Sequence, residues 1–229
     1  MSSFTRTLVA VATGVVAAAA VLAGCTMADT NPGSSPAAER PADVRPLGAG
    51  FLGSNPSPSP EATVSPERGS WDGVVAPAGY RVVLVTAGDD AQAATVVAAV
   101  ERWAAAGSID LDVLTAAHDD EVEEHIETAV EQEPDLVIGA GDDVVDVFTL
   151  LTAQHLAQPF LMIGVELPEP TENVSSVIWP GAAYRGSGVG TSGLIDPASF
   201  TPERADEAVK AGVAGVLHGL TGIVLSLPQ

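Results

Sequence analysis

The sequence predicts a doubly wound α/β domain, and two observations carry that prediction. From Tyr80 onward, short apolar segments alternate with longer segments that have the composition of helices. The apolar segments are near-continuous runs rich in β-branched residues, which is typical of parallel strands covered on both faces. Strands that alternate with helices form βαβ units, and right-handed crossovers place the helices on both sides of one parallel sheet.

Five strands are expected, at residues 81–86, 109–114, 135–139, 160–165 and 174–179. The first begins at Arg81 and reads Val-Val-Leu-Val-Thr before a Gly-Asp-Asp turn, the pattern of a buried strand followed by a loop. We expect the strand order 2-1-3-4-5, which is the flavodoxin-like arrangement. In that topology ligands bind beyond the carboxyl ends of the strands.

Four helices are expected, at residues 90–106, 119–133 and 142–158 and from Thr201 towards Leu225. In the second, Val122, Ile126 and Val130 recur every four residues, so they form one buried stripe below an acidic outer face. The last helix opens with Thr-Pro-Glu, which is a capping residue followed by a favourable first turn.

The charge of the chain is strongly negative. It has 30 Asp and Glu against 9 Lys and Arg, which gives a formal net charge of −21 at pH 7. Such a charge repels phosphate backbones, so the sequence excludes nucleic acid as a partner. A single cysteine, Cys25, also excludes an intramolecular disulfide.

The first 24 residues have the pattern of a secretory signal. A short start with Arg6 precedes an uncharged run from Leu8 to Leu22, and small residues then lead to Cys25. The sequence Leu-Ala-Gly-Cys resembles the lipobox of bacterial lipoproteins. The resemblance implies cleavage after Gly24 and acylation of Cys25, with diacylglycerol and fatty acids such as palmitate. The alternative is a transmembrane anchor, but the apolar run is shorter than the roughly 20 residues that a spanning helix needs.

The segment that follows Cys25 is rich in proline, serine and alanine. Residues 26–79 hold nine of the 17 prolines, a density that opposes both helix and strand periodicity. We therefore assign residues 25–79 to the lipidated cysteine and a tether, and residues 80–229 to the binding-type domain. Within the tether, only residues 47–52 and 71–75 have enough apolar side chains to dock locally.

The expected ligand site lies where the strands end. Its candidate residues are the polar groups and glycines that follow the first, third and fourth strands, together with two aromatic residues after the fifth. They are Gly88, Asp89, Asp90, Gly139, Gly141, Asp142, Glu166, Trp179 and Tyr184. Carboxylates there can accept hydrogen bonds from ligand hydroxyls, and the aromatic rings can stack on a planar ligand.

Several of these residues also have a structural interpretation. Asp89, Asp90, Asp142 and Asp143 are suited to capping the helices that follow, and Trp179 and Tyr184 are suited to the core. Residues 139–144 resemble the start of the glycine fingerprint of dinucleotide-binding proteins, but they do not match it, because Val144 occupies the position of its third glycine.

Catalytic and metal-binding patterns are weak. Glu121 and His125 are one helical turn apart, and His118 follows a strand, but neither pattern supplies enough convergent ligands for a metal. The chain has no Gly-x-Ser-x-Gly elbow. We therefore expect a protein that is not an enzyme and that has no metal and no cofactor.

Three segments resemble the basic membrane protein family of type I periplasmic substrate-binding proteins. They are residues 134–141, residues 160–164, and residues 173–179 followed by Tyr184. The resemblance implies one lobe of a periplasmic-binding-protein fold and a substrate-binding lipoprotein of an ABC importer, often for nucleosides. The sequence departs from the family at Glu166, where Val-Glu replaces its usual aspartate, and at residues 91–94, which lack its aromatic-Asn pattern.

The combined expectation is a lipoprotein on the extracytoplasmic face of the cell membrane. Its partners would be the bilayer, reached through acylated Cys25, a small molecule such as a nucleoside, and an ABC permease or another envelope protein. The alternative function is a non-transporting scaffold or interaction module of the envelope.

Overall fold

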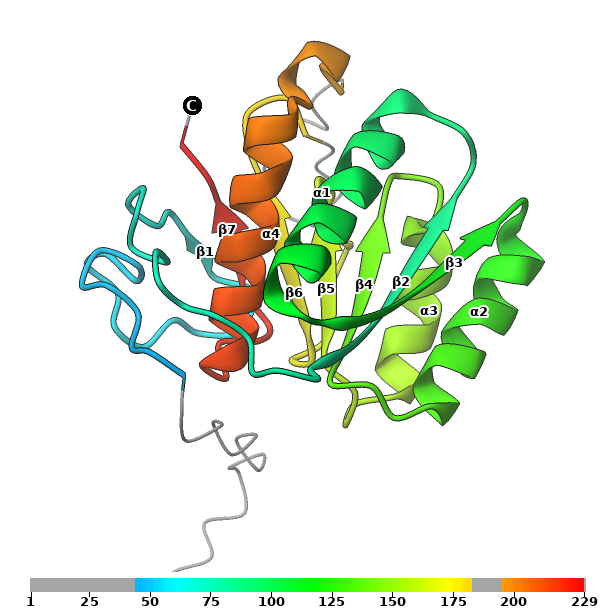
Figure 1. Ribbon diagram of the computed structural model, residues 1–229, viewed down its shortest axis with the longest axis horizontal. Coiled ribbons are helices and arrows are strands. Elements are labelled where there is room, and N and C mark those ends of the chain that lie inside the picture. The colour runs from blue at the N-terminus through cyan, green and yellow to red at the C-terminus, as the bar shows by residue number, and fades with distance from the viewer. Residues whose placement is uncertain (1–43, 183–194, 229) are drawn as a thin grey trace, which may run out of the picture. The chain divides into compact units, whose positions relative to one another are not determined.

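One parallel sheet organises the domain, in the order β1-β7-β6-β5-β4-β2-β3 (Figure 1). The computed structural model describes residues 44–182 and 195–228. Its strands are β1 (Thr63–Val64), β2 (Arg81–Ala87), β3 (Asp110–Ala116), β4 (Leu136–Ala140), β5 (Phe160–Ile163), β6 (Val174–Ile178) and β7 (Val224–Ser226). The helices are α1 (Ala91–Gly107), α2 (Asp119–Glu131), α3 (Val145–Leu151) and α4 (Pro202–Leu217), with 3₁₀ turns η1 (Thr152–Gln154) and η2 (Pro197–Ser199).

The predicted order of the five central strands is confirmed. Strand β2 lies between β3 and β4, with Val83 opposite Asp112 on one side and opposite Val137 on the other. Strands β5 and β6 then continue the sheet in the same direction. The described residues from Tyr80 onward therefore form the doubly wound α/β arrangement that the alternation of strands and helices predicts.

The two faces of the sheet carry separate apolar cores. Helices α1 and α4 cover one face, where Leu84 and Leu161 lie, and helices α2 and α3 cover the other, where Val83 and Phe160 lie (Figure 1). Successive residues of a strand point to opposite faces, so the continuous apolar runs fill both cores at once.

Two helices end earlier than expected. The segment predicted as a helix over residues 142–158 is α3 followed by the turn η1. The last helix does not run towards Leu225, because it ends at Leu217 and the chain turns through Gly219 and Gly222, both at positive φ. Glycine adopts a positive φ without steric cost, and the chain continues from this turn into β7.

Residues 44–79 belong to the folded domain, although the sequence analysis assigned them to the tether. Phe51 is fully buried and its ring reaches to 3.7 Å from where a Cβ on Gly215 of α4 would lie. Trp71 is 3% exposed, and Val64 of β1 pairs with Leu225 of β7. The prolines suppress the periodicity of helices and strands in this segment. A two-residue strand and a few buried apolar residues can nevertheless hold it on the domain without such periodicity.

In the part of the chain that the structure describes, no helix combines the length and the apolar character needed to cross a membrane.

The buried position of Phe51 generates the first prediction. Phe51→Ala should lower the free energy of unfolding by about 3–5 kcal/mol, because it removes a fully buried ring and leaves a cavity. Urea denaturation measures this change. The matched control is Ser57→Ala on the same segment, which is exposed and should change stability by less than about 0.5 kcal/mol. Equal stability of Phe51→Ala and the parent protein would show that this segment is a free tether.

Candidate functional site

A small cavity lies at the carboxyl ends of the central strands. Its volume is about 170 Å³, and its lining comes from the loops after β2, β4 and β5 and from the segment before α4. The lining residues are Asp90, Gln92, Gly141, Asp142, Asp143, Gly164, Ile195 and Phe200. This is the position at which open parallel sheets bind their ligands.

Asp90 is held in place by helix α1. It is the N-cap of that helix, and its Oδ1 accepts a hydrogen bond from the Ala93 amide at 2.8 Å. Its other carboxylate oxygen lies 3.7 Å from where a Cβ on Gly141 would be. The capping interpretation is therefore confirmed for Asp90, and the same side chain also lines the cavity.

Two glycines allow the loops to come together. Gly88 has φ of +72° and Gly141 has φ of +95°. A Cβ on Gly88 would collide with the Asp143 carboxylate, and one on Gly141 would come within 2.8 Å of the Ala93 Cβ. A side chain at either position would push the loops apart, so both glycines set the shape of the cavity.

The electrostatic character of the cavity is acidic. Burial, followed by the carboxylates of Asp90, Asp142, Asp119 and Asp89, raises the pKa of Asp143 above its usual range. Like charges at short distance disfavour one another's ionised form, and a positively charged group among them would relieve that repulsion. The site is therefore suited to a cation or to a donor of several hydrogen bonds.

An aromatic pair closes one side of the cavity. Phe200 lines it and meets Trp179 edge to face, with ring centroids 4.9 Å apart. Trp179 is 3% exposed, and its Nε1 donates to Ser199 Oγ at 3.1 Å. Trp179 thus supports Phe200 from behind and does not line the cavity, in agreement with the core interpretation of this residue.

Two other predicted residues lie in the interior. Gly139 is inside β4, where a Cβ would meet Met162 and Phe148, so it serves packing between the sheet and α3. Glu166 is 7% exposed, its Oε2 has no hydrogen-bond partner in the protein, and burial raises its pKa to about 7. Neither residue lines the cavity.

The structure therefore brings together part of the predicted set. Asp90, Gly141 and Asp142 line the cavity. Gly88 contacts Asp143, and Asp89 adds charge nearby without lining the cavity. Tyr184, like Cys25, is outside the described residues. The sequence analysis missed Gln92, Gly164, Ile195 and Phe200 as lining residues, and a signal existed only for Gly164, which directly follows a buried strand.

The histidine and glutamate at the start of α2 have a structural role. His118 is the N-cap of α2, and its Nδ1 accepts from the Glu121 amide at 3.3 Å. The Glu121 carboxylate reaches back to the Ala117 amide at 2.6 Å. This arrangement resembles a capping box, with the amide of Ala117 in place of the amide of the N-cap residue. Among the described residues, no three side chains of the metal-binding types converge on one point.

Comparisons with known proteins give similar folds at low identity. No family model matches the chain, and no curated protein matches it. A "putative lipoprotein" fragment from Peptoclostridium difficile 630 is 13% identical, with a TM-score of 0.43, over 60% of this chain and 97% of that one. An ABC transporter solute-binding protein from Aeropyrum pernix K1 is 17% identical, with a TM-score of 0.40, over 46% of this chain.

A periplasmic ribose ABC transporter protein from Conexibacter woesei is 20% identical, with a TM-score of 0.38, over 66% of this chain. The chain covers 29% of the length of the Aeropyrum protein and 55% of the length of the Conexibacter protein. The fold assignment rests on the strand order and register described above.

The buried Glu166 carboxyl generates a prediction about pH. Its pKa is about 7 in the folded chain against an ordinary 4.5, so the folded state binds the proton more tightly than the unfolded state. The free energy of unfolding should therefore fall as pH rises from about 4.5 to about 7, by up to about 3 kcal/mol.

The variant Glu166→Gln tests this origin of the pH dependence, because glutamine keeps the shape and stays neutral. The free energy of unfolding, measured by urea denaturation, should differ less between pH 5 and pH 8 for Glu166→Gln than for the parent protein. The variant should be more stable than the parent protein at pH 8. An unchanged difference would mean that Glu166 is not the titrating group.

Proposed function

We propose that this protein is a lipid-anchored, extracytoplasmic binding protein for a small molecule that presents a cationic or hydroxyl-rich group. The observation that carries the proposal is the cavity at the carboxyl ends of β2, β4 and β5, where Asp90, Asp142 and Asp143 meet. Three carboxylates around one space accept hydrogen bonds and attract positive charge. A primary ammonium group satisfies both properties.

The size of the cavity limits how much of a ligand it holds. Pockets for drug-sized ligands measure roughly 300–1,000 Å³, so a cavity of about 170 Å³ takes one end of such a molecule. A nucleoside would engage the carboxylates through its ribose hydroxyls, and an amine would engage them through its ammonium group. The accumulated negative charge favours the amine, with delivery to an ABC importer as the transport role.

The proposal is binding without catalysis. The described residues that line the cavity include no serine, cysteine, lysine or histidine. The carboxylates are instead placed to hold and orient a ligand.

A thermal-shift screen of amines, sugars and nucleosides tests the ligand. A compound at a hundredfold excess over its dissociation constant should raise Tm by about 5 °C or more. Asp142→Asn should weaken binding, since it removes one of the attracting charges. Asp110→Asn is the control, because Asp110 is exposed at the opposite end of β3. Binding of an amine should strengthen as rising pH ionises Asp143.

The outcome that contradicts the proposal is a screen in which no compound raises Tm, or one in which Asp142→Asn and Asp110→Asn bind equally well.

The anchor half of the proposal gains support from the position of Arg45 in the domain. The structure describes the chain from Val44, and the Arg45 carbonyl lies 2.9 Å from Nε2 of His218, the C-cap of α4. That end of α4 lies at the amino ends of the strands (Figure 1). Arg45 therefore lies at the end of the domain opposite the cavity.

Residues 26–43 separate Cys25 from Val44, and fully extended they reach roughly 65 Å. A diacylated cysteine provides the two hydrocarbon chains that stable membrane attachment requires.

Metabolic labelling with a fatty acid tests the anchor. In a bacterial host, the parent protein should incorporate labelled palmitate and partition with membranes, because the thiol of Cys25 accepts the diacylglycerol. Cys25→Ser should lose both properties. Gly48→Ser is not a suitable control, because a Cβ on Gly48 would meet the backbone of Ser70. Ser57→Ala, at an exposed position, is the matched control. Label on the Cys25→Ser protein would contradict the assignment.

A second candidate function is an interaction module of the cell envelope. Two large apolar side chains are exposed together, Leu150 by 69% and Leu156 by 64%. Leu156 lines a groove of about 520 Å³ at the amino ends of the strands. Exposed apolar groups beside a groove are typical of surfaces that meet another protein, such as an ABC permease.

A further inference from the structure

A second and larger groove lies between α4 and the segment that follows β1. Its volume is about 530 Å³, within the range of sites that hold a small ligand. One wall is the first two turns of α4, another is residues 68–72, and Leu227 and Pro228 close it beyond β7. It shares no lining residue with the acidic cavity.

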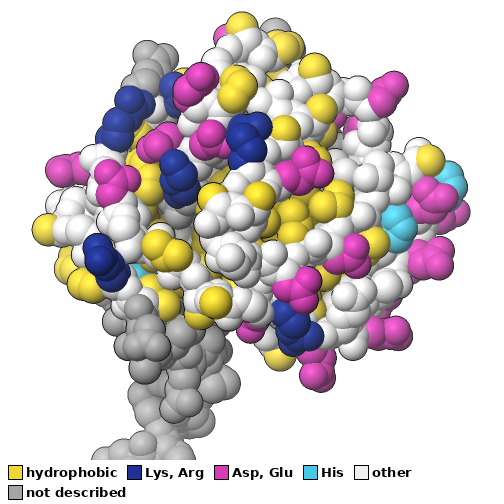
Figure 2. Space-filling model, in the orientation of Figure 1, with side chains coloured by type: hydrophobic (Ala, Val, Ile, Leu, Met, Phe, Trp, Pro, Cys, Tyr) yellow, Lys and Arg dark blue, Asp and Glu magenta, His cyan; other side chains and the backbone are white. Residues whose placement is uncertain are grey.

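The groove collects the rare cations of the chain. Of its nine Lys and Arg residues, Arg68, Arg204 and Lys210 all line this one groove. Figure 2 shows several dark blue side chains over the upper left of the face in view, with acidic side chains among them, and others lower on the same face. The amino end of α4 adds the positive end of its helix dipole at the same place.

Two residues that line the groove, Arg68 and Trp71, have side-chain donors without a partner among the described residues. The Arg68 side chain makes no hydrogen bond or ion pair with any described residue. Ser70 Oγ and Trp71 Nε1 are buried without a hydrogen-bond partner, and Trp71 lines the groove. Arg204 uses one nitrogen, Nη1, to donate to the Pro228 carbonyl at 2.8 Å. These groups together favour a ligand that carries an anionic acceptor.

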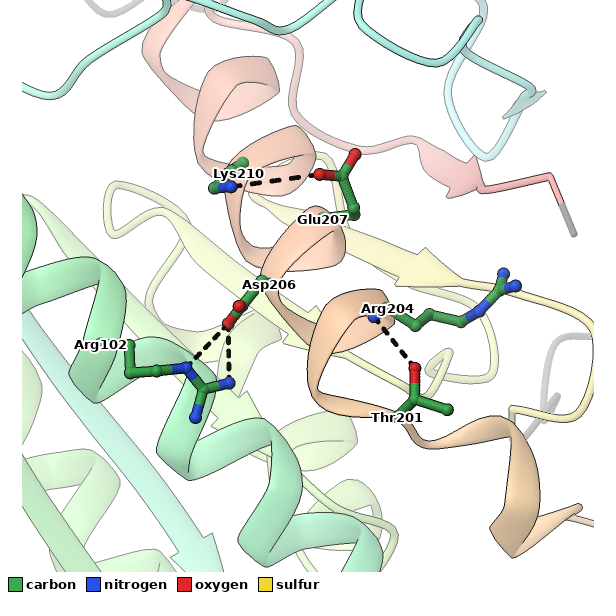
Figure 3. Close-up of polar contacts among 6 residues, drawn as sticks. All are labelled: Arg102, Thr201, Arg204, Asp206, Glu207 and Lys210. Carbon is green, nitrogen blue, oxygen red and sulfur yellow. Dashed lines mark hydrogen bonds and ion pairs between the residues drawn. The ribbon is translucent and has the colours of Figure 1, made fainter.

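The groove also holds carboxylates, and ion pairs account for two of them. Asp206 accepts from Arg102 of α1 at 2.7 Å, and Glu207 lies 4.0 Å from Lys210 (Figure 3). Glu203 and Asp72 form no ion pair or side-chain hydrogen bond with described residues.

Apart from the residues in these ion pairs, the groove has two cationic and two anionic side chains that could contact a ligand. Arg68 and Arg204 match a carboxylate, and Glu203 and Asp72 match an ammonium group. A purely anionic ligand would be repelled by those two carboxylates, and a purely cationic ligand would be repelled by the two guanidinium groups.

We propose that this groove binds a zwitterion, namely an amino acid or a short peptide with a free amino group and a free carboxylate. The ligand carboxylate contacts Arg68 and Arg204 near the start of α4, and its ammonium group contacts Glu203 and Asp72. This site is separate from the proposed cation cavity, so either assignment can hold without the other.

Calorimetric titration of the full chain with trialanine tests the proposal. Trialanine should bind, whereas N-acetyl-trialanine and trialaninamide, which each lack one charge, should bind roughly tenfold more weakly or worse. Arg68→Gln and Glu203→Gln should each weaken trialanine binding by a similar factor, since each removes one charge-assisted hydrogen bond. The fluorescence of Trp71 offers a second readout, which Trp71→Phe removes.

Matched controls separate local contacts from net charge. Arg45→Gln and Glu123→Gln make the same charge changes at exposed positions that do not line the groove, and they should leave binding unchanged. Asp142→Asn should also leave it unchanged, which keeps this test independent of the acidic cavity. Urea denaturation confirms that each variant is folded.

Three results overturn the proposal. They are no heat of binding at millimolar trialanine, equal binding of the acetylated peptide, which indicates a simple anion site, and equal binding of the amidated peptide, which indicates a cation site.

Discussion

The structure depends on burial of the central strands on both faces. Every residue of β4 and β5 is buried, so the sheet is stable only when α1 and α4 cover one side and α2 and α3 cover the other. Right-handed crossovers place helices on both faces, and because the strands are parallel, all the strand-to-helix loops lie at one edge. The cavity exists because those loops meet there, with Gly88 and Gly141 allowing the close approach.

The same requirement explains why residues 44–79 fold back onto the domain. Helix α4 is buried along most of its length, and its small residues, such as Gly212 and Gly215, allow close packing. Its side away from α1 needs a cover, which Phe51 and Trp71 supply. Strand β1 pairs with β7 and so covers the sheet edge, where exposed backbone groups would otherwise invite pairing with another chain. The groove forms where this cover meets the first turns of α4.

The sequence predicted what depends on local pattern. Continuous apolar runs identified β2 to β6 and their order, and a capping aspartate identified the start of α1. Strands β1 and β7 have two and three residues, too few for a period to be seen. Phe200 joins the cavity only through the fold, because 57 residues separate it from Asp143. Glu166 has the right chemistry and follows the right strand, yet it is buried and does not line the cavity.

The two proposed sites on this acidic molecule differ in the charge of the ligand group that they attract. A formal net charge of −21 attracts cations and repels anions at long range, so the acidic cavity adds local contacts to a field that already favours its ligand. An anionic group can bind only where local donors outweigh that field, and Arg68 and Arg204 are such donors in the proposed groove site. A zwitterion has no net charge and so is not repelled on approach. The global charge and the local pairing therefore favour the same class of ligand for the groove.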